Sequence, residues 1–197
     1  MTQAPTIVRD PGEQTLRQAA ALHCLLLPGS AISRLEPSFA RSFYRYAARS
    51  RAEIVLAAVQ NDAVIAAAVL SLRPQDLQSR LLLHTPLLPQ MALHPLAALD
   101  IVRDRLFGRT EGAVDPALPE VIAIFTAPAH QGRGIGARLL RGIEAELSAR
   151  GLPRYGLRTE EAAGNRAIAF YDKQGFKAVG RAHTAHGRFR VMAKEIR

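Results

Sequence analysis

Hydrophobic positions along the chain follow two spacings, one typical of helices and one typical of strands. In the first half these spacings predict a strand at 6–9, helices at 13–27 and 37–49, and strands at 53–59 and 63–72. The last two runs are apolar on both faces, and the polar turn Gln60-Asn61-Asp62 between them is typical of a hairpin. We therefore expect a β-hairpin that is covered on both sides.

The second half of the chain has a clearer pattern. It predicts strands at 120–126 and 154–160, a helix after each, and an antiparallel pair at 176–181 and 187–195. In the first of these helices Ile135, Leu139, Ile143 and Leu147 recur every four residues and form one apolar stripe. A strand, a helix and a strand in this order predict two parallel strands joined by a crossover, and hence a mixed α/β sheet.

Residues 74–118 have the least regular pattern. Three prolines interrupt leucine-rich stretches there, which predicts one or two helices with broken connections. We expect this segment to form a helical insertion or lid over the sheet, within a single domain that spans residues 1–197. The alternative is that its leucines complete the core.

Composition narrows the class of protein. The longest apolar run, 63–70, is far shorter than the roughly 20 residues of a transmembrane helix, so we expect no membrane span. The absence of a signal-peptide pattern at the first residues and the single cysteine favour a cytoplasmic protein. The formal charge of +9 permits nucleic acid or an anionic small molecule as ligand. An aromatic content of 6% without tryptophan argues against a base-stacking surface, so nucleic acid is not the expected partner.

A metal site is not expected either. The six histidines show no spacing typical of metal ligands, and His183 and His186 lie in a predicted hairpin loop. Cys24 lies on the apolar face of a predicted helix, where a core residue is more common than a nucleophile.

The strongest chemical signal is the glycine-rich stretch from Gln131 to Ala137, between a predicted strand and a predicted helix. Glycine lets the backbone approach a ligand closely, and the first N–H groups of a helix have no partner within it. With the helix dipole they form a site for a phosphate or pyrophosphate. The alternative is an ordinary tight turn. The stretch lacks the Gly-Lys-Ser/Thr of a P-loop, and its glycine spacing differs from the Rossmann fingerprint.

Two motifs resemble those of the GNAT family of N-acetyltransferases. Residues 124–136, IFTAPAHQGRGIG, resemble the family's acetyl-CoA signature Gln/Arg-x-x-Gly-x-Gly/Ala. Residues 165–176, NRAIAFYDKQGF, contain the Asn, Ala, Tyr and Gly-Phe of its second motif in the same order. The match covers about residues 119–181. The resemblance implies a mixed, mostly antiparallel central sheet with helices on both faces and a parallel strand pair at the acetyl-CoA site.

The resemblance also implies an enzyme, an acetyl-CoA-dependent N-acetyltransferase without a metal. It would transfer the acetyl group to a primary amine of a small molecule by direct attack in a ternary complex. The implied cofactor contacts are Ile124, Phe125 and Thr126 for the pantetheine arm, Gln131, Gly132, Arg133, Gly134, Ile135, Gly136 and Ala137 for the pyrophosphate, and Asn165 and Tyr171 beside the arm. An ordinary N-cap is the alternative role of Asn165.

Tyr171 is the general acid that the resemblance implies, placed to protonate the leaving thiolate. Its alternative role is an aromatic residue packed beside Phe170 and Phe176.

A base is needed as well, because a protonated amine has no lone pair with which to attack. Glu120 occupies a place where many family members carry an acidic residue. Strand alternation puts it on the side of Ile122, Ile124 and Thr126. Glu160 and Glu161 are the alternative bases.

The acceptor is not identified by the sequence. We expect it to contact the helices around 29–46, the 74–118 segment and the loop at 182–187. Nearby cations would suit a carboxylate or phosphate, unless they form a solvated helix face: Arg34, Arg41 and Arg45. Two alternative functions stay open, namely a protein N-terminal or lysine acetyltransferase and a non-catalytic acyl-CoA-binding regulatory module. Assembly as a homodimer also stays open.

Overall fold

A computed structural model describes residues 4–96, 98–99, 102–103, 108–184 and 187–196. The strands are β1 (Thr6–Arg9), β2 (Glu53–Gln60), β3 (Ala63–Ser71), β4 (Arg109–Gly112), β5 (Glu120–Thr126), β6 (Arg154–Glu160), β7 (Lys177–Thr184) and β8 (Gly187–Glu195). The helices are α1 (Glu13–Leu26), α2 (Ala31–Arg34), α3 (Pro37–Arg49), α4 (Leu77–His84), α5 (Leu87–Leu93), α7 (Ile135–Ser148) and α8 (Arg166–Lys173), and two 3-10 turns are η1 (Pro74–Asp76) and η2 (Pro128–His130).

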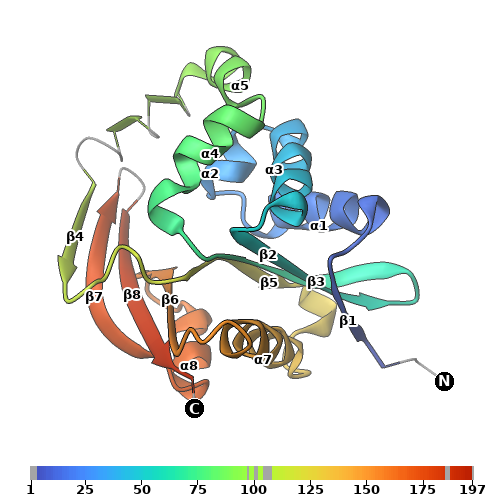
Figure 1. Cartoon of the computed structure of the whole chain (residues 1–197), viewed down its shortest axis with the longest axis vertical. Coiled ribbons are helices and arrows are strands. Elements are labelled where there is room, and N and C mark those ends of the chain that lie inside the picture. The colour runs from blue at the N-terminus through green and yellow to red at the C-terminus, as the bar shows by residue number, and fades with distance from the viewer. Residues whose placement is uncertain (1–3, 97, 100–101, 104–107, 185–186, 197) are drawn as a thin grey trace.

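The strands form one sheet in the order β1-β2-β3-β5-β6-β8-β7-β4. Neighbouring strands are antiparallel except β5 and β6, which are parallel. Helices α1 to α5 lie over one face of the sheet, and α7 and α8 lie over the other (Figure 1). The predicted fold class, a mixed and mostly antiparallel sheet with one parallel pair and helices on both faces, is confirmed.

Two hydrophobic clusters hold the layers together, one on each face of the sheet. Phe39 and Phe43 of α3 pack with β2 and β3 on the first face, and the predicted stripe of α7 packs on the second. All four residues of that stripe are buried. The hairpin of β2 and β3 is buried along almost its whole length, so its coverage on both sides is confirmed.

The segment 74–118 contributes helices, core and sheet. It contains α4 and α5, and Leu77, Leu81 and Leu87 join the cluster formed by α3. The alternative that its leucines complete the core therefore holds for these three. Strand β4, which the sequence pattern does not predict, pairs with β7 at the edge of the sheet. Its residues are exposed, so no apolar alternation marks it.

A β-bulge changes which side of β5 each residue faces. Val69 pairs with Ala123 but Leu70 pairs with Val121, which leaves Ile122 as the extra residue. Val121 and Ile124 consequently pack in the α7 cluster, whereas Ile122 packs on the α3 side. The expected alternation from Glu120 to Ile124 is therefore wrong, because the bulge reverses it. Glu120 faces the α3 side together with Ile122.

Candidate active site

The two parallel strands are paired only at their beginnings. Glu120 pairs with Gly156 and Val121 with Leu157, and the structure records no further pairs before β5 ends at Thr126. The strands diverge beyond this point (Figure 1). The described backbone of 124–126 consequently presents an edge toward β6 whose peptide groups can bond to a ligand.

A cavity of about 700 Å³ lies at this divergence. The end of β5, the glycine-rich turn, the start of α7 and helix α8 form its walls. It collects most of the residues expected to contact the cofactor, namely Ile124, Phe125, Thr126, Gln131, Gly132, Gly134, Ile135, Gly136, Ala137 and Tyr171. Arg133 and Asn165 are not among its lining residues. Seven further lining residues were not predicted as cofactor contacts, namely Leu26, Leu27, His130, Arg166, Ala167, Phe170 and Gln174.

The glycines of the turn have two different roles. Gly132 and Gly134 both have φ of +74°, and a Cβ at either would meet no described atom within 4 Å. Here glycine is needed for the left-handed backbone, and the space above it is open. At Gly136 a Cβ would lie 3.1 Å from the Phe170 ring, so this glycine lets α8 pack closely on α7.

The turn is fastened to the end of β5 and leads directly into α7. The Gln131 side chain donates a hydrogen bond to the Thr126 carbonyl at 3.2 Å, and Gly134 is the N-cap of the helix. The unpaired N–H groups of the first helical turn thus border the cavity beside Ile135 and Gly136. This arrangement is suited to a bound anion.

Asn165 is the N-cap of α8. Its Oδ1 accepts from the Ala167 N–H at 3.0 Å, and its Nδ2 donates to Thr159 Oγ1 at 3.1 Å and to the Glu160 carbonyl at 2.6 Å. The amide therefore joins the end of β6 to the start of α8. The structure describes the N-cap role, while a contact with the cofactor stays a prediction.

Tyr171 lies in the wall of this cavity and is 7% exposed. Its ring packs against Phe170 and Phe176, with ring centroids 5.2 and 5.6 Å away. Burial raises the pKa of the Tyr171 hydroxyl to about 12, so the group keeps its proton at neutral pH. Packing and proton donation are compatible for this residue.

Glu120 lines a second cavity, of about 480 Å³, on the other side of the bulge. Its Oε1 lies 3.2 Å from Nε of Arg158, the neighbouring strand's residue on the same side. Burial raises the pKa of the Glu120 carboxyl, and the charge of Arg158 opposes this shift. A carboxylate with a raised pKa is a better proton acceptor than an exposed one.

The walls of this second cavity come from segments far apart in the sequence. They include residues 74–78 at the start of α4, the stretch 108–118 and residues 182–184 of β7. The 74–118 segment and the end of β7 thus line the same cavity as Glu120, while their expected contact with the acceptor stays a prediction. The helices around 29–46 do not contribute, and Arg45 is ion-paired with Glu13 at 2.7 Å.

The alternative bases lie outside both cavities. Glu161 accepts hydrogen bonds from Arg181 at 3.3 Å and from Arg190 at 3.5 Å. Burial acts to raise the pKa of Glu161, but the two guanidinium groups lower it. Glu161 is therefore a poor proton acceptor at neutral pH.

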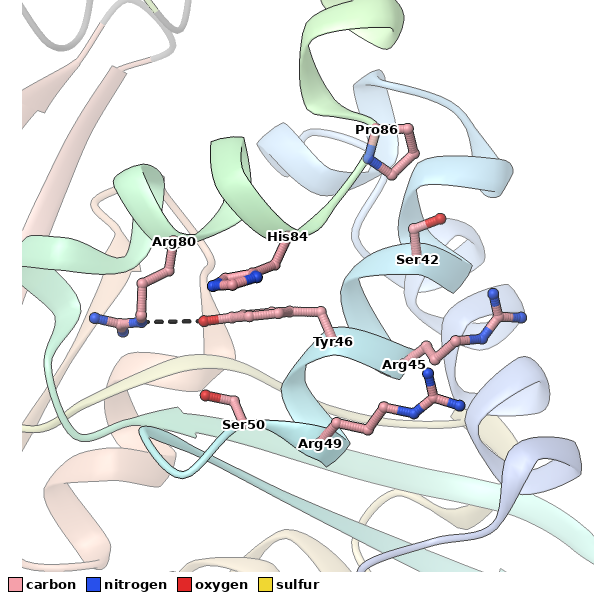
Figure 2. Close-up of a pocket in the computed structure, with 8 residues that line it drawn as sticks. All are labelled: Ser42, Arg45, Tyr46, Arg49, Ser50, Arg80, His84 and Pro86. Carbon is pink, nitrogen blue, oxygen red and sulfur yellow. Dashed lines mark hydrogen bonds between the residues drawn. The ribbon is translucent and has the colours of Figure 1, made fainter.

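A third cavity, of about 470 Å³, lies between α3 and α4. Tyr46 stacks on His84 with an interplanar angle of 11°, and Arg80 Nε donates to the Tyr46 hydroxyl at 3.0 Å (Figure 2). Arg45 and Arg49 extend away from this ring pair (Figure 2). The cations around this cavity do not converge on one point, so it is not arranged as an anion site.

Arg80 instead fastens α4 to the sheet. It donates to Glu53 Oε1 at 2.6 Å and to the Arg73 carbonyl at 3.0 Å, and the Glu53 side chain is fully buried. Ser71 also donates to Glu53 Oε1, at 3.1 Å. This contact fixes the helix whose first residues form a wall of the Glu120 cavity.

Neither a metal site nor a membrane span is found among the residues that the structure describes. No group of three or more His, Cys, Asp or Glu side chains is placed to hold a metal ion. No described helix has the length and apolar character needed to cross a membrane. The expectation that His183 lies in a hairpin loop is wrong, because it belongs to β7, with Nε2 3.8 Å from Glu111 Oε1. His186 lies outside the described residues.

Comparison with known proteins identifies the family. Residues 20–176 match the family model described as the acetyltransferase (GNAT) family. The chain belongs to the GNAT family. It is therefore an acetyl-CoA-dependent N-acetyltransferase, and the matched range contains the glycine-rich turn, Glu120 and Tyr171.

Solved structures of GNAT proteins share the fold at low sequence identity. The PaiA N-acetyltransferase of Thermoplasma acidophilum, solved with coenzyme A, has a TM-score of 0.62 at 15% identity, covering 98% of this chain and 99% of that one. An aminoglycoside 6'-acetyltransferase type Ii has a TM-score of 0.61 at 18% identity, covering 98% and 97%. The ribosomal-protein-S18-alanine N-acetyltransferase of Escherichia coli has a TM-score of 0.56 at 19% identity, covering 98% and 94%. By their names, these GNAT proteins act on both small-molecule and protein acceptors.

Proposed function

We propose that this GNAT enzyme transfers an acetyl group from acetyl-CoA to a primary amine of a small molecule, by direct attack in a ternary complex. The observation that carries the proposal is the placement of two cavities around the divergence of β5 and β6. Tyr171 lines one cavity and Glu120 lines the other. The proposal thus puts a proton donor in the cavity assigned to acetyl-CoA and a proton acceptor in the cavity assigned to the amine.

The cavity of Tyr171 suits acetyl-CoA. Open space above Gly132 and Gly134 and the N-terminus of α7 favour the pyrophosphate there, and the free strand edge at 124–126 can pair with the pantetheine amides. Bound in this way, acetyl-CoA supplies an activated thioester. The chain's own residues hold the thioester in place and handle the protons.

Two residues would carry the proton transfers. Glu120 accepts a proton from the acceptor's ammonium group, directly or through water, which frees the nitrogen lone pair to attack the thioester carbonyl. The new carbon–nitrogen bond forms as the carbon–sulfur bond breaks. The Tyr171 hydroxyl then donates its proton to the departing sulfur, for which its raised pKa keeps it ready.

A small acceptor is favoured by the size of the Glu120 cavity. At about 480 Å³ it lies in the range of small-molecule sites, and residues of the start of α4 and of strand β4 both line it. A protein acceptor would need a groove open at both ends for an extended segment.

The test is a panel of amines with acetyl-CoA, read by release of the free thiol. We expect turnover with small primary amines, together with stabilisation of the fold by acetyl-CoA in a thermal melt. Stabilisation without thiol release from any amine would instead support a non-catalytic acyl-CoA-binding module. Turnover confined to peptides or proteins would overturn the small-molecule acceptor.

A further inference from the structure

We infer that the acceptor is zwitterionic, a small molecule that carries a carboxylate beside its amine, as a free amino acid does. The inference rests on the proposed function and deepens it. It starts from the arginine and carboxylate residues in the described lining of the Glu120 cavity, which are Arg109, Asp115, Glu120 and Arg158. Both signs of charge are therefore present in one small cavity.

Arg158 places a guanidinium beside the proposed base. Its Nε lies 3.2 Å from Glu120 Oε1, and its side chain is 43% exposed. A guanidinium has five N–H donors in a planar fork. The single contact with one Glu120 oxygen leaves most of these donors available to a ligand. An acceptor whose amine lies at Glu120 would consequently have its carboxylate next to Arg158, at the short separation found in an amino acid.

Arg109 adds a second cation from another wall of the same cavity. It begins β4, directly opposite His183 of β7 in the sheet. Apart from this backbone pairing, the Arg109 side chain has no hydrogen bond or ion pair with the other residues that the structure describes. Two guanidinium groups therefore line the cavity, and among the residues that the structure describes only Glu120 places a carboxylate at ion-pair distance from either.

The same charges disfavour acceptors with several amines. A polyamine or an aminoglycoside needs acidic groups for each additional ammonium, and Asp115 is the one acidic residue besides Glu120 in the described part of the lining. Asp115 Oδ1 already accepts a hydrogen bond from the Ala117 N–H at 2.9 Å. Arg109 and Arg158 would repel a second ammonium group. The balance of charge thus selects one amine and one anion.

The experiment compares matched acceptors that differ only in the carboxylate. Steady-state kinetics would be measured with free amino acids, their carboxamides, spermidine, an aminoglycoside and a short peptide amide with a free N-terminus. We expect kcat/KM for the best amino acid to exceed that for its carboxamide by at least about tenfold, because the carboxamide cannot form the charged pair. Spermidine and the aminoglycoside should be poorer still.

Two variants assign the preference to the cavity. Arg109→Gln should raise KM for the amino acid about tenfold with little change in kcat, and so reduce the ratio of kcat/KM between the amino acid and its carboxamide. Arg158→Lys keeps the charge beside Glu120 but removes the fork, so it should also reduce the preference for the carboxylate. Arg17→Gln is the matched control, since it removes the same charge from exposed helix α1 outside the cavity.

The outcomes separate the inference from the function on which it rests. Equal kcat/KM for acid and carboxamide, with Arg109→Gln behaving like Arg17→Gln, overturns the zwitterionic acceptor while the amine acetyltransferase stands. A preference for the peptide amide points to a protein acceptor and overturns the inference as well. If no amine is acetylated although acetyl-CoA stabilises the fold, the proposed function itself fails.

Discussion

Single residues decide the chemistry. Substitutions of Tyr171 and Glu120 should reduce turnover with different dependences on pH. Tyr171→Phe removes one hydroxyl and little volume, so acetyl-CoA binding should persist. Turnover should fall by roughly 10²–10⁴, the range typical of a lost general acid. Raising the pH should not restore it, because the departing thiolate still needs a proton.

Glu120→Gln should instead act on the amine side. Its rate deficit should shrink as the pH rises, because the acceptor then loses its proton in solution without help. Paired pH–rate profiles on one good acceptor test both residues. Normal turnover of Tyr171→Phe would contradict its role as the general acid. If Glu120→Gln has the wild-type rate at every pH, the base would be Glu160, Glu161 or water.

Gly134 offers a matched test of the phosphate site. Gly134→Glu puts a side chain and a negative charge at the N-terminus of α7, where the pyrophosphate would bind, so the melting shift caused by acetyl-CoA should disappear. Gly151→Glu is the control. Gly151 also has a positive φ, of +67°, and open space around a Cβ, so both variants carry similar backbone strain. Equal melting shifts in the two variants would exclude the turn as the cofactor site.

The buried His23 should make the free energy of unfolding depend on pH. It is 1% exposed and hydrogen-bonded to the Tyr44 hydroxyl at 3.0 Å and the Ser30 hydroxyl at 2.8 Å. Burial lowers the pKa of the imidazole from 6.5 to about 4. The unfolded chain therefore binds a proton between these pH values that the folded chain does not, and the free energy of unfolding falls as the pH drops from 6.5 toward 4.

The loss should approach roughly 3 kcal/mol, from about 1.4 kcal/mol for each pH unit between the two pKa values. Urea unfolding of the wild type and of His23→Gln from pH 7.5 to pH 4 measures it. The variant is less stable at pH 7.5, and the gap between the two proteins should narrow as the pH falls. A constant gap would show that His23 does not titrate in this range.

At the scale of elements, the ion pair of Arg80 and Glu53 should hold α4 in place. Arg80→Met keeps the side chain's apolar stem but leaves the buried Glu53 carboxylate without its cation, which costs roughly 3–5 kcal/mol. Adding Glu53→Gln should recover part of that loss. Arg150→Met removes one of two cations from Glu146 on α7, which keeps Arg9 at 2.8 Å, and should cost less than about 1 kcal/mol. Urea unfolding of the four proteins checks this, and a loss in Arg80→Met no larger than in Arg150→Met would contradict it.

Elements also show what a single sequence can and cannot predict. The stripe of α7 and the apolar hairpin are local patterns, and both are found where periodicity places them. Strand β4 has four exposed residues and helix α2 has four residues, so neither carries a period long enough to detect. The bulge at Ile122 depends on how β5 pairs with β3, and no feature of β5 alone predicts it.

At the scale of the whole molecule, the site also contains parts that local sequence patterns predict and parts that depend on the tertiary fold. The glycine-rich turn is one contiguous stretch, and the motif therefore indicates most of the lining of the larger cavity. The Glu120 cavity combines residues 74–78, 108–118 and 182–184 around two central strands. Arg109 and Arg158 line the same cavity only because of the order of strands in the sheet. Neither could therefore be predicted from the sequence as an acceptor-binding residue.

The early end of pairing between β5 and β6 makes the sheet two half-sheets, β1-β2-β3-β5 and β6-β8-β7-β4. Two residue pairs join them, helped by α7, where Glu144 accepts from Tyr155 of β6 and Lys194 of β8, both at 2.7 Å. A ligand seated along 124–126 would act as a missing rung between the halves. The amides of this edge should exchange with deuterium rapidly in the free protein and slowly with acetyl-CoA, while those paired to β3 stay protected throughout. Bound acetyl-CoA would then link the two half-sheets and reduce their motion relative to each other. The walls of the acceptor cavity would become more rigid as a result.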